Sequence, residues 1–200
     1  MSETVYQLGG DLKEAGAMTD GLTAYVRGSN LYGSAGGGLF SNRMPSLTIG
    51  ALLMRLRRLH ALEDRLTPAQ RTTLAQIDAK HEATRSEWSM HYHEKLSQEG
   101  FSRLKAMNTF FEECTERPRG CAGIYLPEAL RRTIVQEIIT TAKTSAYADL
   151  KLAAEARKVD GRLRRFTQPQ GFIWAAELES AYPATVYWWL YAKPMNDQDK

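Results

Sequence analysis

Apolar and semi-apolar residues follow one another through residues 67–117 mostly in steps of three, four or sums of these, the spacing that places side chains on one face of a helix. They are Leu74, Ile77, His81, Trp88, Tyr92, Leu96, Leu104, Met107, Phe111 and Cys114. Thr67-Pro68-Ala69-Gln70 has the composition of a capping box with proline at the first helical position, and Pro118 ends the pattern. The sequence therefore predicts one continuous helix over residues 67–117, a rod of roughly 75 Å at the rise of an α-helix.

Two further amphipathic patterns lie on either side of this rod. One predicts a helix over about residues 46–66, with Ser46 as its N-cap. The other predicts a helix over about residues 126–166. Because the segment that joins this last helix to the rod is short, the two are expected to form a long antiparallel hairpin.

The two ends of the chain differ from the middle in composition. Residues 1–45 are rich in Gly, Ser and Asn and show no clear helical period, so they are expected to form an extended arm with short strands near residues 5–8 and 22–26. The glycine run in residues 33–40 lacks the Gly-Lys-Ser/Thr sequence of a phosphate-binding loop, and we interpret it as a flexible connector. Residues 167–200 are dense in Trp and Tyr and predict a compact irregular cap, with a helical turn near residues 175–180.

These patterns together predict an all-α protein. Its expected core is an elongated helical bundle over residues 46–166, built on the long antiparallel hairpin. An extended Gly-rich arm, residues 1–45, precedes the bundle, and an aromatic cap, residues 167–200, follows it.

Composition and cysteine usage suggest a compartment. The chain has 200 residues and a net charge of only +3, and it contains no apolar run of membrane-spanning length and no basic start followed by one. We therefore expect a cytoplasmic protein. Cys114 and Cys121 flank a six-residue loop that a disulfide could close, but without a secretion signal we favour free thiols.

The predicted lengths suggest the leading function. A helix over residues 46–66, about 30 Å long, covers less than half of the rod. Apolar surface should then stay exposed near the far tip, at Met107, Phe110 and Phe111, and the aromatic tail offers a second contact surface through Trp188, Trp189 and Tyr191. We expect a non-enzymatic scaffold, adaptor or assembly subunit that binds another protein or a second copy of itself.

Arginine clusters suggest an alternative, a helical subunit associated with nucleic acid. The clusters comprise Arg55, Arg57, Arg58, Arg162, Arg164 and Arg165. Basic helices that pair with an acidic neighbour would also account for them, and the small net charge is weak for a nucleic-acid reader.

An enzyme is the third hypothesis, with a small-molecule site near His91. The histidines at 81, 91 and 93 lie close together, but the chain has no Glu-x-x-His pair of a di-iron bundle and no His-Glu-x-x-His motif of a zinc protease. It also has no Gly-x-Ser-x-Gly nucleophile turn. The sequence therefore predicts no catalytic residue, metal or cofactor.

Overall fold

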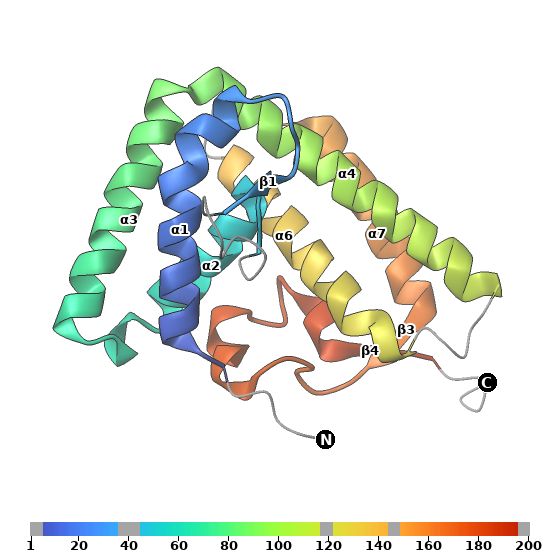
Figure 1. Cartoon of the computed structure of the whole chain (residues 1–200). Helices are drawn as coiled ribbons and strands as arrows, with labels where there is room; N and C mark the ends of the chain where they lie inside the picture. Colours follow the sequence, from blue (N-terminus) through green and yellow to red (C-terminus); the bar gives the residue numbers. More distant parts are fainter. Residues whose placement is uncertain (1–5, 36–44, 117–121, 144–148, 196–200) are drawn as a thin grey trace. The chain divides into compact units, whose positions relative to one another are not determined.

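The computed structural model describes residues 6–35, 45–116, 122–143 and 149–195. The protein is mostly helical, with packed helices, two small antiparallel sheets and a cluster of aromatic side chains near the C-terminus (Figure 1). The predicted all-α class is thus confirmed at this level. The chain divides into two compact units, an N-terminal unit, Gln7–Glu99, and a C-terminal unit that contains Gly100–Lys200 together with Met1–Tyr6.

The N-terminal unit is built around α1 (Leu8–Arg27), which packs against both α2 (Ile49–Ala61) and α3 (Pro68–Glu87). A 3₁₀ turn, Glu63–Arg65, joins α2 to α3, and β1 (Gly33–Ser34) pairs with β2 (Ser46–Leu47). Fully buried apolar side chains of the three helices form the core, among them Leu22, Leu52, Leu59 and Leu74.

The extended N-terminal arm was a wrong prediction, because residues 8–27 form the helix α1. Its buried residues Leu12, Ala15, Met18, Leu22 and Val26 recur at helical spacing. Four glycines in the same stretch masked that period, since glycine is a poor helix former. At Gly21 the missing side chain has a use, because an added Cβ would lie only 3.3 Å from Leu47 Cδ2. Most of the glycine run in residues 33–40 lies outside the described residues.

The helix predicted over residues 46–66 exists but begins later. Ser46 lies in β2, and the N-cap of α2 is Thr48, whose hydroxyl accepts a hydrogen bond from Ala51 N at 3.3 Å. The helix ends at Ala61, and Leu62 is its C-cap.

The single rod over residues 67–117 was also a wrong prediction. Its start is as predicted, with a capping box between Thr67 and Gln70. The helix is interrupted at Trp88, however, and continues as a separate helix, α4 (Ser89–Glu116). His81 Nε2 and the Tyr92 hydroxyl lie 2.8 Å apart, whereas eleven residues of straight helix would separate their backbones by about 16 Å. The chain must therefore bend between them.

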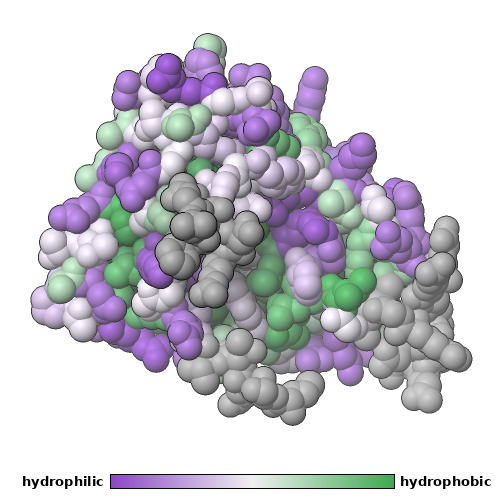
Figure 2. Space-filling model, in the orientation of Figure 1, coloured by the Kyte–Doolittle hydropathy of each residue, from purple (hydrophilic) through white to green (hydrophobic). Residues whose placement is uncertain are grey.

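The apolar face of α3 is covered within the N-terminal unit. Its inward residues Leu74, Ile77, His81 and Thr84 are buried, and α1 packs against this helix. Hydrophilic residues predominate over α3 on the face that Figure 2 shows.

The C-terminal unit contains α4 from Gly100 onward, a 3₁₀ turn Ala122–Ile124, α6 (Tyr125–Lys143) and α7 (Leu150–Phe166). The helix predicted over residues 126–166 is thus two helices, and α7 has its own N-cap, Asp149. Phe111 of α4 contacts Phe166 at the end of α7, while Gly100 contacts Leu152 near its start. α7 therefore runs parallel to α4, so the expected long antiparallel hairpin does not describe this pair.

A cluster of aromatic side chains lies in the C-terminal segment, where the sequence predicts an aromatic cap over residues 167–200, and the structure describes this segment as far as residue 195. β3 (Thr167–Pro169) pairs with β4 (Ala192–Pro194), and two 3₁₀ helices, Ala176–Ala181 and Trp188–Tyr191, lie between them. Trp189 anchors the cap on α6, because its Nε1 donates to Thr133 Oγ1 at 2.9 Å and its carbonyl accepts from the Tyr125 hydroxyl at 2.8 Å.

The free thiol expected at Cys114 is a wrong prediction, because Cys114 is disulfide-bonded. The sequence contains one other cysteine, Cys121, which lies outside the described residues. None of the helices that the structure describes combines the length and the apolar character needed to cross a lipid bilayer.

Candidate functional site

The charge of this protein is concentrated in α7. This helix contains six basic and two acidic side chains, a net charge of +4, while the whole chain carries +3. The rest of the chain therefore sums to −1. The basic residues of α7 are Lys151, Arg157, Lys158, Arg162, Arg164 and Arg165, and all six are exposed.

Neither acidic side chain of α7 pairs with the arginines at the end of this helix. Asp160 accepts two hydrogen bonds from the buried Arg132 of α6, at 2.6 and 2.9 Å. Glu155 pairs with Lys158 at 2.9 Å. Within the described part of the chain, no carboxylate therefore forms an ion pair with the three arginines at the end of α7, Arg162, Arg164 and Arg165.

The basic side chains form two rows along α7. Lys151, Lys158, Arg162 and Arg165 follow one another in steps of seven, four and three, so they share one side of the helix. Arg157 and Arg164, seven residues apart, share another. The longer row spans about 21 Å of helix. Arg164 and Arg165 lie in the last turn of α7, where the negative end of the helix dipole favours cations.

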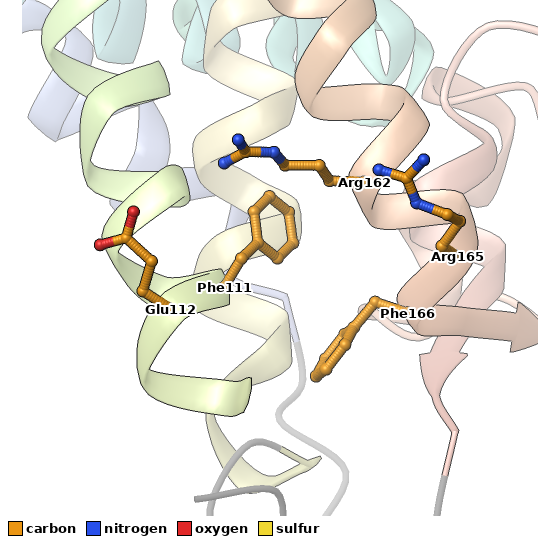
Figure 3. Close-up of a pocket in the computed structure, with 5 residues that line it drawn as sticks. All are labelled: Phe111, Glu112, Arg162, Arg165 and Phe166. Carbon is orange, nitrogen blue, oxygen red and sulfur yellow. The ribbon is translucent and has the colours of Figure 1, made fainter. Parts of the chain in front are cut away.

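The longer row ends at a pocket of about 330 Å³ between α4 and α7. Phe111 and Phe166 supply its aromatic wall, with ring centroids 6.2 Å apart and planes inclined at 65°. Arg162 reaches from α7 toward α4 beside the Phe111 ring, and Arg165 lies on the same side of the pocket (Figure 3). Glu112 completes the lining. We call this the phenylalanine pocket.

The shorter row ends at a second pocket, of about 370 Å³, between the end of α7 and the aromatic cap. The guanidinium of Arg164 stacks over the Trp188 ring at 3.9 Å from its centroid. Tyr191 and Pro169 also line this pocket, together with Thr167, Gln168, Ala184 and Ala192. Arg164 thus combines a positive charge with an aromatic surface in one place.

The apolar tip expected to be exposed is buried within the C-terminal unit. Met107 is fully buried, and Phe110 and Phe111 are 5% and 8% exposed. Phe166 of α7 contacts both phenylalanine rings and helps to cover them. The expectation of an uncovered apolar surface at these three residues is therefore wrong.

The three cap residues named as a contact surface behave differently from one another. Trp189 is buried and held by Thr133, and the Arg132 guanidinium lies 4.1 Å from its ring centroid. Trp188 and Tyr191 are half-buried and line the second pocket. Only these two offer ring surface to a partner.

The first arginine cluster belongs to the N-terminal unit and serves its core. Arg58 is buried and donates two hydrogen bonds to Asp11, at 2.5 and 2.8 Å. Arg55 pairs with Glu14 at 2.6 Å, and Arg57 is half-buried. Arg55 and Arg58 therefore join α2 to α1.

The histidines at 81 and 91 lie in different surroundings. His91 is exposed and contacts the edge of Trp88, while His81 is buried against Tyr92. Burial lowers the pKa of His81, and Arg85 lowers it further. Among the described residues, no three His, Cys, Asp or Glu side chains gather in a group that could hold a metal ion.

No protein-family model, curated protein or solved structure matches this chain. The sequence had named Arg162, Arg164 and Arg165 for nucleic-acid binding and Trp188 for protein binding, and it had not joined them in one site. A charge count over residues 150–166 alone would have found the basic helix, while the net charge of the whole chain concealed it. The contribution of Phe166 had no signal in the sequence.

Proposed function

We propose that this chain is a non-enzymatic protein that binds single-stranded nucleic acid through α7. The observation that carries the proposal is that α7, whose basic side chains are all exposed, has a net charge of +4, more than the net charge of +3 of the whole chain. Arg162, Arg164 and Arg165 have no ion-pair partner among the described residues, so their charges are available to an external anion.

An extended polyanion fits this surface better than a single small anion does. The longer basic row presents four cations over about 21 Å. A nucleic-acid strand has a phosphate on every nucleotide, so a strand lying along this row would present a series of anions to it. Each phosphate contact displaces a counterion from the strand, which favours association at low salt.

The rings at the ends of the two rows favour a single strand over a duplex. Phe166, Trp188 and Tyr191 are half-buried and lie beside arginines. Single-strand binders combine basic grooves with aromatic rings on which bases stack, whereas a duplex hides the faces of its bases.

A protein partner is the second candidate, favoured by the pocket beside Trp188. An acidic segment of another protein could pair with Arg164 and pack on Trp188 and Tyr191, since Trp, Tyr and Arg are enriched in protein interfaces. The surface first expected to bind such a partner, at Met107, Phe110 and Phe111, is buried. This candidate therefore depends on the cap alone.

Fluorescence anisotropy with a labelled single strand of roughly 12 nucleotides tests the proposal. Binding should weaken as salt rises, with a slope of log affinity against log salt that grows by about 0.7 for each phosphate contact. The double variant Arg162→Gln/Arg165→Gln should bind more weakly and reduce this slope by about 1.4.

A matched control removes the same charge from the other unit. Arg65 and Arg71 are exposed in the N-terminal unit, and Arg65→Gln/Arg71→Gln should leave both affinity and slope almost unchanged. Equal losses in the two double variants would mean that only net charge matters and would contradict an α7 site. Absence of binding at low salt, with retention of an acidic peptide, would favour the second candidate instead.

A further inference from the structure

The phenylalanine pocket has features that phosphate contacts alone do not require. Its wall is formed by Phe111 and Phe166. Phe111 is almost fully buried, so its position is fixed by the core, while Phe166 is half-buried and keeps part of its ring accessible. Phe110 also contacts Phe166, with ring centroids 6.2 Å apart. The accessible ring is therefore held in place before any ligand arrives.

One of the two arginines of the pocket is also fixed. Arg162 Nη1 donates a hydrogen bond to Asn108 Oδ1 of α4 at 2.9 Å, which holds the guanidinium across the space between the two helices. This bond uses one donor of a group that has five, and the others remain available. Arg165 forms no ion pair within the described residues. With Glu112 as the single acidic group of the lining, the pocket carries a net charge of +1.

We propose that the phenylalanine pocket binds one nucleobase of the bound strand, with the adjacent phosphate on Arg162 and Arg165. This inference rests on the proposed function and names the part of the ligand that this pocket holds. The base stacks on the accessible face of Phe166, and the guanidinium planes of the arginines extend the same surface.

The size of the pocket agrees with this occupant. At about 330 Å³ it lies at the lower end of the range for small-molecule sites, which suits one ring system and its phosphate. Inorganic phosphate alone would leave the aromatic wall unused. An uncharged apolar ligand would offer no anion to Arg162 and Arg165.

The test compares a normal oligonucleotide with an abasic one of equal length, which has the same backbone charge and no bases. Wild-type protein should bind the normal strand at least about tenfold more tightly, as expected from stacking of one base. Phe166→Leu keeps apolar volume but removes the ring, and it should lower this preference by about tenfold, the share of one stacked base, while leaving the affinity for the abasic strand unchanged. Phe166→Tyr retains a ring and should restore the preference.

Phe101 provides the matched control. It lies on α4, is 39% exposed and does not line the pocket, so Phe101→Leu should change neither affinity. Equal binding of the normal and abasic strands by wild-type protein would overturn the base pocket and leave the proposed function standing. An equal loss for both strands in Phe166→Leu would also overturn it, because the preference for the normal strand would then not depend on the Phe166 ring. Failure of both strands to bind wild-type protein at low salt would overturn the proposed function and this inference together.

Discussion

Leu152 of α7 lies directly against the backbone of α4 at Gly100, where an added Cβ would come within 2.7 Å of Leu152 Cδ2. Leu152 is 1% exposed, so its side chain has little room to move away. A glycine is normally unfavourable inside a helix. Here it permits the close approach that holds the basic helix against its neighbour.

Gly100→Ala should therefore destabilise the protein. Overpacking against Leu152 costs about 1–3 kcal/mol, and the better helix propensity of alanine returns about 1 kcal/mol, so the free energy of unfolding should fall by up to about 2 kcal/mol. Gly161→Ala in α7 is the control, because nothing lies within 4 Å of its added Cβ. That substitution should stabilise by about 0.5–1 kcal/mol. Urea unfolding followed by circular dichroism measures both, and equal effects at the two sites would contradict the close contact.

The buried His81 should make the N-terminal unit sensitive to acid. Burial lowers its pKa from 6.5 and the nearby Arg85 lowers it further, although Glu82 and Asp78 act in the opposite direction. The neutral side chain is bonded to Tyr92 in the folded state, so its contribution is present above pH 6.5 and is lost as the pH falls through the lowered pKa.

The variant His81→Gln keeps a hydrogen-bonding side chain but cannot titrate. We expect wild-type protein to lose more stability than this variant between neutral pH and about pH 5, measured by urea unfolding. His93 has a pKa lowered by burial as well, so His93→Gln is the comparison that separates the two contributions. An identical pH dependence in wild type and His81→Gln would show that His81 does not titrate in this range.

The ion pair between Asp11 and Arg58 should be costly to break. Arg58 is 4% exposed and donates two hydrogen bonds to this carboxylate, at 2.5 and 2.8 Å. Asp11→Asn would leave a buried guanidinium without its counterion, at a cost of about 3–5 kcal/mol. Asp20→Asn removes one partner of an exposed pair with Lys80 and should cost at most about 1 kcal/mol. Thermal unfolding of both variants measures the difference, and a small loss in Asp11→Asn would mean that water reaches Arg58.

The neighbouring tryptophans of the cap should differ sharply in their effect on stability. Trp189→Phe loses the bond to Thr133 and the stacking of Arg132, and with the missing ring volume it should cost about 2–3 kcal/mol. Trp188→Phe keeps a ring at a half-buried position and should cost less than about 1 kcal/mol. Chemical denaturation of the two variants checks this order, and a reversed order would contradict the placement of Trp189 in the core.

Helix content could be read from the sequence wherever the signal was local. The capping box at Thr67, the helices on either side of it and the aromatic cap each depend on residues close together in the chain. The interruption at Trp88 could not be read, because the apolar period continues through it and the contact between His81 and Tyr92 selects the bend. Helix α1 was missed because four glycines lower its helix propensity, and only at Gly21 does close packing, against Leu47, account for the residue.

The candidate site divides in the same way. The sequence named the arginines of residues 162–165 and the ring of Trp188, since composition alone marks them. It could not tell that Asp160 pairs with Arg132 of another helix, nor that Phe166 covers Phe110 and Phe111. Both facts depend on which helices become neighbours.

The sequence by itself determined that this chain is helical, where α3 begins and that aromatic side chains close its C-terminal end. These features are fixed by capping, periodicity and composition over a few turns. Only the tertiary structure decided which charges are paired and which apolar residues are covered, because burial and ion pairing depend on contacts between residues far apart in the chain. Those contacts placed the apolar tip in the core and left the arginines at the end of α7 without carboxylate partners among the described residues.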